Sequence, residues 1–218
     1  MGTSGRLVAL EGVDGCGKST QARLLAAAVG VEPTAEPGGT PVGAALRRVL
    51  LDPGLPDLDE RTEALLMAAD RAEHVARVLR PALHAGRWVV TDRYSGSTLA
   101  YQGYGRGLDL DDLRRLLSWA TGGLAADLSV VLDVDVAAAA ARAAGRSGGG
   151  ETGAGGADRM ERRGAAFLQR VADGYAALAA ADPERWAVVD GSGPVEEVAS
   201  AVRATVAARL GEPPGGWR

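Results

Sequence analysis

The chain has 218 residues, a mass of 22.3 kDa and a formal net charge of −4 at pH 7. This length suits one sizeable α/β domain, and the slight acidity excludes a protein that coats nucleic acid with a basic face. Hydrophobic residues make up 46% of the chain, no apolar run reaches the ~18 residues of a membrane span, and one cysteine forms no internal disulfide. We therefore expect a cytoplasmic protein with one domain over residues 1–211, bound to neither nucleic acid nor membrane.

Short apolar runs alternate with longer amphipathic or alanine-rich runs, which predicts alternating strands and helices. In chain order we expect strand 6–10, helices 19–29, 42–51 and 59–79, strand 88–91, helix 110–119, strand 128–134, helices 136–144 and 162–181, strand 186–190 and helix 195–210. Pro81 is expected to bend or end the long third helix. Apolar strands separated by helices are typical of a parallel sheet covered on both faces, with ligands at the carboxyl ends of its strands.

Two segments carry too little apolar surface to pack firmly. Residues 145–157 contain seven glycines, and we interpret them as a mobile flap, with a passive linker between two helices as the alternative. The Pro-Pro-Gly-Gly tail, residues 212–218, is expected to be disordered.

A phosphate-binding loop follows the first predicted strand and opens the first predicted helix. The run Gly12-Val-Asp-Gly-Cys-Gly-Lys18-Ser19 fits the pattern G-x-x-x-x-G-K-[ST] in the context that the motif requires. Its glycines allow backbone N–H groups to turn toward phosphates, Lys18 reaches the β- and γ-phosphates, and Ser19 offers a hydroxyl to Mg²⁺. The expected nucleotide-binding residues are Gly12, Val13, Asp14, Gly15, Cys16, Gly17, Lys18, Ser19 and Thr20.

Lysine usage supports this interpretation. Lys18 is the only lysine among 24 lysine and arginine residues. Arginine replaces lysine freely on solvated surfaces, but a compact ammonium is needed inside a tight phosphate loop. The chain therefore keeps its lysine at the position where the chemistry requires one.

Asp92-Arg93-Tyr94 ends a predicted strand at the same edge of the sheet. A carboxylate at this position suits Mg²⁺, and the arginine fork suits phosphate. A structural ion pair at a strand end is the alternative for these two residues.

Four stretches resemble the bacterial thymidylate kinases, in that family's order and at nearly its spacing: Glu11–Thr20, Glu36–Thr40, Asp92–Gly107 and Asp158–Glu161. The resemblance implies a P-loop nucleoside monophosphate kinase fold, with a five-stranded parallel sheet, helices on both faces and a mobile flap at about 142–161. It further implies transfer of the γ-phosphoryl group of ATP to dTMP with Mg²⁺, for dTTP synthesis, by a homodimer.

The resemblance also implies roles at the phosphate and the sugar of the acceptor. Asp14 resembles the carboxylate that binds the sugar 3′-hydroxyl, with a solvated loop acid as the alternative. Arg47 and Arg93 resemble the pair that holds the acceptor phosphate. Glu36, which lies in a matching stretch, is also expected to bind the acceptor. Because Arg48 is adjacent, Arg47 also fits a surface arginine.

Further residues match the part of the family's site that reads the base. Arg71 resembles the arginine that hydrogen-bonds the thymine carbonyl, while Thr98 and Gln102 resemble the polar groups at the base edge. Tyr101 resembles the aromatic residue that crowds the sugar 2′ position. Helix packing alone is the alternative for Thr98, Tyr101 and Gln102.

Some kinases of the family that this chain resembles carry an arginine within the phosphate-binding loop. Here Val13-Asp-Gly-Cys16 contains none, so the resemblance implies that the arginine comes from elsewhere. The candidates flank the predicted flap and would act like an arginine finger when the flap closes: Arg142, Arg146 and Arg159. Asp158 and Glu161 would align them, or would serve as a helix cap and first-turn acid.

One departure bears on base selectivity. Met67 stands where the family usually has a phenylalanine stacked on thymine, which leaves a kinase of dUMP or of another deoxypyrimidine monophosphate as an alternative. A non-catalytic homologue is a second alternative, although Lys18 and Asp92 are present. A switch GTPase is excluded, because its N-K-x-D motif needs a second lysine. His74 and His84 are expected at the surface and receive no role.

Overall fold

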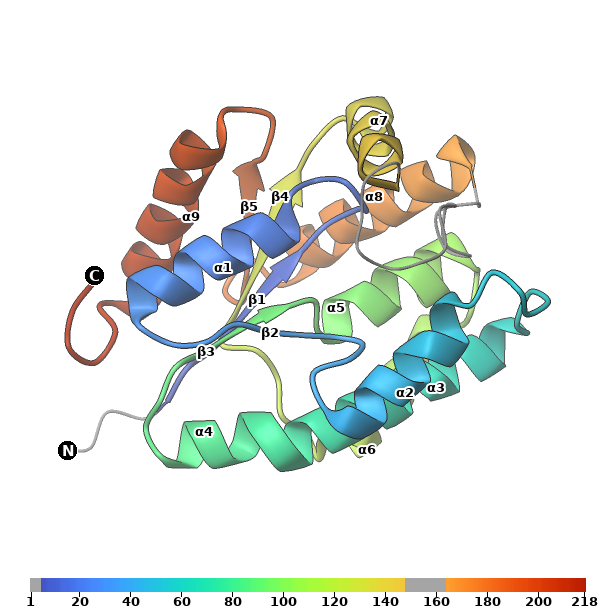
Figure 1. Ribbon diagram of the computed structural model, residues 1–218, viewed down its shortest axis with the longest axis horizontal. Helices are drawn as coiled ribbons and strands as arrows, with labels where there is room; N and C mark the ends of the chain where they lie inside the picture. Colours follow the sequence, from blue (N-terminus) through green and yellow to red (C-terminus); the bar gives the residue numbers. More distant parts are fainter. Residues whose placement is uncertain (1–4, 148–163) are drawn as a thin grey trace.

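A five-stranded parallel sheet runs through the middle of the molecule in the computed structural model, which describes residues 5–147 and 164–218 (Figure 1). The strand order is β2-β3-β1-β4-β5, and the strands are β1 (Leu7–Glu11), β2 (Thr34–Ala35), β3 (Val89–Asp92), β4 (Leu128–Asp133) and β5 (Trp186–Asp190). This confirms the predicted fold class. Sequence patterning located four of the strands but missed β2, because two residues are too few to show a period.

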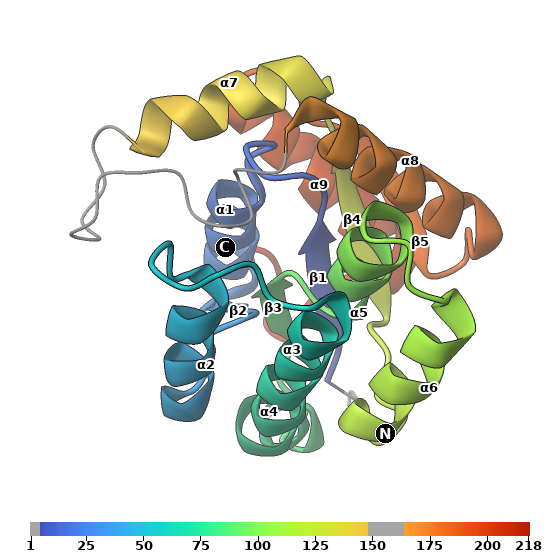
Figure 2. The same ribbon diagram turned by 90° about the vertical axis from the view of Figure 1, so that its right-hand side faces the viewer.

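Helices cover both faces of the sheet (Figure 2). They are α1 (Lys18–Val29), α2 (Pro41–Leu51), α3 (Glu60–His74), η1 (Val75–Leu79), α4 (Arg80–His84), α5 (Ser95–Thr98), η2 (Leu99–Gly105), α6 (Leu110–Thr121), α7 (Val136–Ser147), α8 (Ala165–Ala181) and α9 (Val195–Leu210). Side chains of β1 alternate between two cores. Val8 and Leu10 pack with α1 and α9, whereas Leu7 and Ala9 pack with η1 and α4.

Pro81 does not end the long third helix, which continues past it to His84. The helix passes from α3 through the π-helical turn η1 into α4, which contains Pro81 at its first turn. A proline ring clashes with the carbonyl four residues earlier in a regular α-helix. The wider π turn relieves this conflict and lets the helix continue to His84.

The tail at residues 212–218 is packed against the body, so the prediction of disorder was wrong. The Trp217 ring meets the Trp88 ring edge to face, with centroids 6.4 Å apart. The Arg218 backbone N–H donates to the carbonyl of Ala28 at 2.8 Å. One tryptophan supplies the apolar contact that the preceding prolines and glycines lack. In the described ranges, no helix combines the length and the apolar character needed to cross a membrane.

Candidate active site

The phosphate-binding loop joins the end of β1 to the start of α1, as the sequence predicted. Gly15 and Gly17 have φ angles of 87° and 100°, in the left-handed region that favours glycine. Gly15 also lies directly under α7, since a Cβ added there would be 1.9 Å from the carbonyl oxygen of Ala139. The loop is therefore held between the sheet and α7.

Lys18 lies inside this loop with 5% of its surface exposed. Its ammonium donates to the carbonyl of Val13 at 2.7 Å. Cys16 is also buried, at 2% exposure, and its Sγ lies 3.8 Å from Lys18 Nζ. The loop has room for a slender ammonium at this point but not for a planar guanidinium.

Ser19 and Asp92 form a small oxygen cluster at the rim of the loop. The Ser19 hydroxyl donates to Asp92 Oδ2 at 2.5 Å. Asp92 Oδ1 is buried and has no hydrogen-bond partner among the described residues. A hydroxyl and a carboxylate with one unsatisfied oxygen fit the ligands that Mg²⁺ takes from proteins beside substrate phosphates.

A cavity beside the loop brings together residues from six separate parts of the chain. All nine of the residues that were expected to bind the acceptor line it: Asp14, Glu36, Arg47, Met67, Arg71, Arg93, Thr98, Tyr101 and Gln102. Pro37, Leu51 and Ser97 complete the lining. We refer to this space as the acceptor cavity.

Arg93 is the cation at the junction of the acceptor cavity and the loop. Its backbone has a φ of 72°, which is uncommon for a residue other than glycine and occurs most often at functional sites. Its guanidinium donates to Asp14 at 2.5 Å, to Ser97 Oγ at 2.9 Å and to the Tyr101 hydroxyl at 3.2 Å. It also lies over the Tyr101 ring, 4.8 Å from the centroid.

The charge of Arg93 controls the ionisation of Asp14. Burial would raise the pKa of this carboxyl, but the charges of Arg93 and Lys18 and a hydrogen bond from Tyr101 outweigh burial and lower the pKa to about 2. Asp14 is therefore a carboxylate at neutral pH, able to accept a hydrogen bond from a hydroxyl group.

Arg71 forms part of the wall of the acceptor cavity and is 1% exposed. Three of its N–H groups donate to Glu36 Oε2 at 2.6 Å, to Thr98 Oγ1 at 2.9 Å and to the Tyr94 carbonyl at 2.8 Å. A guanidinium has five N–H groups, so two more are available for a ligand. This network fixes the plane of the arginine.

His74 is buried, so our expectation of a surface position was wrong. It is 0% exposed, with Nδ1 2.7 Å from Glu36 Oε1 and Nε2 2.7 Å from Thr34 Oγ1. It therefore supports the carboxylate that holds Arg71. Helical periodicity could not reveal this, because His74 meets Glu36 and Thr34 only in the tertiary fold.

The remaining predicted residues of the cavity differ in their environments. The Gln102 side-chain amide donates to Glu63 Oε1 at 2.9 Å, and Arg106 also binds Glu63, at 2.6 Å. Arg47 donates to the Pro37 carbonyl at 2.9 Å. Met67 is half-buried in the lining.

Arg142 is the one flap candidate whose side chain the structure describes, and it does not join this cluster. Arg142 donates to the carbonyls of Gly191 and Ser192, each at 3.3 Å, and does not line the acceptor cavity. The side chain of Arg146 and all of Arg159 lie outside the described residues, as do Asp158 and Glu161.

Sequence reasoning assigned no role to three residues that surround Arg93. Glu11 and Ser97 lie in stretches that resemble the family, and Tyr175 lies on α8. Glu11 accepts hydrogen bonds from the other two and is 0% exposed. Burial raises the pKa of the Glu11 carboxyl, while the hydrogen bond from Ser97 and the charge of Arg93 oppose that rise.

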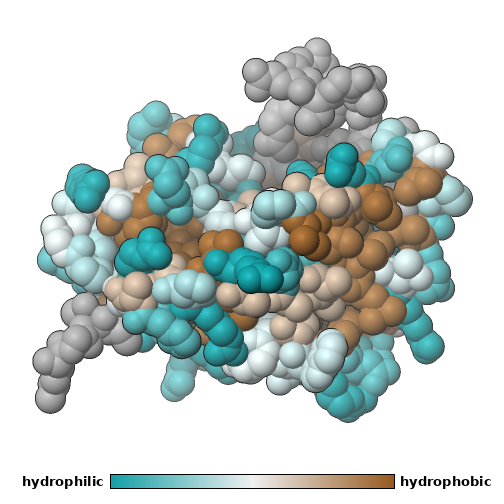
Figure 3. Space-filling model, turned by 60° about the horizontal axis from the view of Figure 1, so that its bottom comes forward, coloured by the Kyte–Doolittle hydropathy of each residue, from teal (hydrophilic) through white to brown (hydrophobic). Residues whose placement is uncertain are grey.

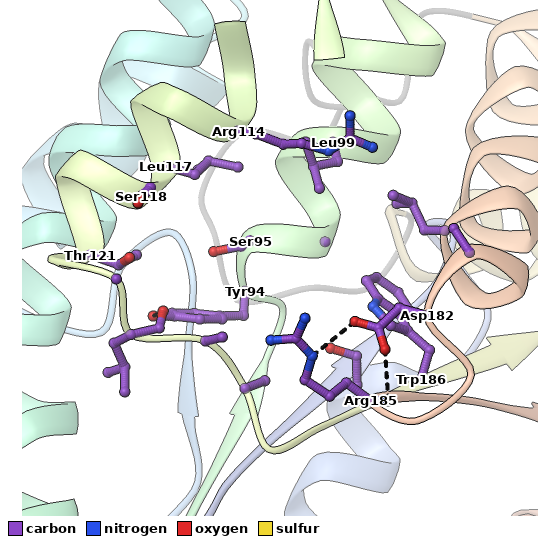
Figure 4. A pocket seen from close by; sticks show the side chains of 18 residues that line it. Tyr94, Ser95, Leu99, Arg114, Leu117, Ser118, Thr121, Asp182, Arg185 and Trp186 are labelled. Atoms are coloured by element: carbon purple, nitrogen blue, oxygen red, sulfur yellow. Dashed lines mark hydrogen bonds and ion pairs between the residues drawn. The ribbon is translucent and has the colours of Figure 1, made fainter. Parts of the chain in front are cut away.

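A larger cavity, of about 530 Å³, lies on the other side of Tyr94 (Figure 4). Its walls come from α5, α6, α8 and the starts of β4 and β5, and none of the predicted site residues lines it. Its two arginines are paired, Arg185 with Asp182 and Arg114 with Asp111, each at 2.8 Å. The buried charges converge instead at the smaller acceptor cavity.

Comparison with known proteins gives a consistent result. A family model described as thymidylate kinase matches residues 10–202. Thymidylate kinases from Prochlorococcus marinus (strain MIT 9303) and Solidesulfovibrio magneticus are 46% and 48% identical, over 95% and 89% of this chain and 96% and 95% of their own sequences. The crystal structure of thymidylate kinase from Ehrlichia chaffeensis has a TM-score of 0.75 at 27% identity, covering 93% of this chain and 99% of its own.

Proposed function

Because the chain belongs to the thymidylate kinase family, it transfers the γ-phosphoryl group of ATP to dTMP, and we propose that the acceptor cavity holds dTMP. The observation that carries this proposal is the convergence of nine separately predicted residues on one cavity beside the phosphate-binding loop. Neither a kinase of another monophosphate nor a non-catalytic homologue has comparable support.

The reaction needs positioning rather than a general base. A phosphate monoester has a second pKa near 6, so the acceptor oxygen is already largely deprotonated at pH 7. The enzyme must hold two repelling phosphates in line and offset the charge that develops between them. Lys18 would serve the donor phosphates, and Arg93 and Arg47 the acceptor phosphate.

Mg²⁺ would be held by Ser19 and Asp92, with ATP as the phosphoryl donor. The unsatisfied Asp92 Oδ1 beside the Ser19 hydroxyl supports this assignment. When bound, the ion would neutralise charge on the donor phosphates. The supply of a further arginine by Arg142, Arg146 or Arg159 remains a proposal.

The base would lie between Arg71 and Met67, which are one turn apart on α3 and both line the cavity. Arg71 would donate to the thymine carbonyl with an N–H that the network leaves available. Gln102 and Thr98 would meet the base edge, Tyr101 the sugar 2′ position, and Asp14 the 3′-hydroxyl.

A panel of deoxynucleoside monophosphates with ATP tests this arrangement. The wild-type enzyme should prefer dTMP to dUMP. Met67→Phe should lower KM for dTMP two- to tenfold, since stacking contributes about 0.5–1.5 kcal/mol, with kcat and KM for ATP nearly unchanged. If Met67→Phe raises KM for dTMP and lowers KM for another monophosphate, the base is not where we place it.

We also propose a cytoplasmic homodimer, in which a second copy covers an apolar surface on α2, α3 and the loop between them. Val42, Val49, Leu55 and Leu65 are 40–58% exposed there. Figure 3, which brings the underside of the molecule forward, shows apolar residues gathered on its right half, the side of α2 and α3 in Figure 1. A sedimentation measurement of about twice the monomer mass of 22.3 kDa, reduced to one mass by Leu65→Glu, would support this surface.

A further inference from the structure

Glu11, at the end of β1, is a fully buried carboxylate located behind Arg93. Its Oε1 accepts the backbone N–H groups of Tyr94 and Ser97, at 3.0 and 3.2 Å. Its Oε2 accepts the Ser97 hydroxyl at 2.6 Å and the Tyr175 hydroxyl at 3.1 Å. All four donors thus come from α8 or from the chain that follows Arg93.

Two of these donors are also bonded to Arg93. Nη1 of Arg93 donates to Ser97 Oγ at 2.9 Å and to the Tyr175 hydroxyl at 3.4 Å. Both hydroxyls lie within hydrogen-bond distance of Glu11 Oε2, and they are also 2.9 Å from each other, where either can donate. A connected network of hydrogen bonds therefore runs from Arg93 through the two hydroxyls to one buried carboxylate, where low dielectric strengthens each bond.

The opposite edge of the Arg93 guanidinium is held by two residues that line the acceptor cavity. Nη2 donates to Asp14 and to the Tyr101 hydroxyl. Arg93 is consequently clamped between residues that line the cavity and residues that do not. Glu11 and Tyr175 belong to the second group, because neither lines the acceptor cavity.

The start of α5 is packed tightly onto the same carboxylate. A Cβ added at Gly96 would lie 2.8 Å from Glu11 Oε1 and 2.5 Å from the Trp186 ring. This close approach brings the Ser97 N–H and hydroxyl within reach of Glu11. The carboxylate thus fixes both the first turn of α5 and the arginine in front of it.

We propose that Glu11 is a positioning residue for dTMP phosphorylation, which orients Arg93 toward the acceptor phosphate through the hydroxyl groups of Ser97 and Tyr175. This inference rests on the proposed role of Arg93. Glu11 acts without touching the substrate, and Tyr175 carries its effect from α8 to the acceptor side.

Glu11→Gln tests the hydrogen-bond network at its buried carboxylate, because the amide has the same shape but carries no charge. The backbone N–H groups of Tyr94 and Ser97 hold the remaining amide oxygen, so the new NH₂ group faces the two hydroxyls. Their protons lose the oxygen that accepts them, and Arg93 loses a nearby negative charge. We expect KM for dTMP to rise about tenfold or more, with KM for ATP within about twofold of wild type.

Tyr175→Phe and Ser97→Ala each remove one of the two hydroxyls and test the proposal if Glu11→Gln does not fold. Each should raise KM for dTMP severalfold without affecting KM for ATP. Tyr175→Phe is the sharper of the two, because Tyr175 does not line the cavity. Ser129→Ala is the matched control for Ser97→Ala, since the two serines are 7% and 8% exposed and Ser129 lines the other cavity, not the acceptor cavity.

Arg93→Ala separates failure of this inference from failure of the proposed function. If Arg93→Ala leaves KM for dTMP unchanged, the proposed role of Arg93 is wrong. If Arg93→Ala raises KM for dTMP and Tyr175→Phe does not, only the positioning role is overturned. Equal increases in KM for dTMP and ATP would also overturn it, because they indicate a general loss of structure. A fall in kcat alone would overturn it as well, because the lost interaction would then act only in the transition state and not on binding of the acceptor phosphate.

Discussion

At the scale of single residues, Lys18 shows how one charge is selected by its surroundings. It is buried in a loop whose backbone approaches its ammonium to 2.7 Å. Lys18→Arg keeps the charge but places a broad fork where a slender group is needed. We expect kcat to fall more than tenfold, which corresponds to more than about 1.4 kcal/mol of transition-state stabilisation.

The measurement is steady-state turnover of dTMP at saturating ATP. Arg77→Lys, on the exposed surface of η1, is the reverse exchange and should leave kcat unchanged. Retention of a tenth or more of wild-type turnover in Lys18→Arg would contradict the account of the single lysine.

The ionisation of Asp14 should make the stability of the protein depend on pH. Its pKa in the folded protein, about 2, is below the ordinary value of 3.8. The ionised carboxylate therefore stabilises the fold above pH 4, and this contribution is lost as the pH falls from about 4 toward 2. The free energy of unfolding, measured with urea, should fall by roughly 1 kcal/mol more in wild type than in Asp14→Asn between pH 6 and pH 3. The same fall in both proteins would show that Asp14 is not held by Arg93.

At the scale of elements, the phosphate-binding loop depends on α7 as well as on β1 and α1. The carbonyl of Ala139 lies over Gly15 with no space for a methyl group. Gly15→Ala must therefore shift either the loop or α7, and it also strains a backbone with positive φ. We expect lower thermal stability and a several-fold higher KM for ATP.

Gly145→Ala, on α7 itself, is the control for that prediction. Its added methyl group would meet no atom of the described residues within 4 Å. Alanine favours a helix over glycine by about 0.5–1 kcal/mol, so this variant should be unchanged or slightly more stable. If both variants retain wild-type KM for ATP, the contact between α7 and the loop has no bearing on nucleotide binding.

At the scale of the whole molecule, the C-terminal tail packs on the core that α1 and α9 form with one face of the sheet. Trp217 packs against Trp88 and joins the larger of the two cores. Trp217→Ala should lower the free energy of unfolding by about 1–2 kcal/mol, less than the ~3–5 kcal/mol of a fully buried aromatic ring. Urea unfolding measures the difference.

Trp119→Ala provides the comparison, because Trp119 on α6 is 83% exposed. Its removal should change the free energy of unfolding by less than about 0.5 kcal/mol. Equal losses in the two variants would mean that the tail does not stabilise the core.

The sequence by itself determined the parts of this protein that are local. The phosphate-binding loop, four of the five strands and most helices are specified by glycine spacing and by apolar periods that neighbouring residues carry. The resemblance to the family added the residues of the acceptor cavity, three of which lie outside the four matching stretches, and the fold brings all nine of them to one place.

Only the tertiary structure decided what each of these residues contacts. The burial of His74 against Glu36, the link from Arg93 through Tyr175 to Glu11, and the packing of Trp217 on Trp88 join residues far apart in the chain. No local pattern encodes such pairs, because their distances depend on how the strands and helices pack together. Buried polar groups must find partners wherever the fold brings them, and here those partners hold arginines that line the acceptor cavity.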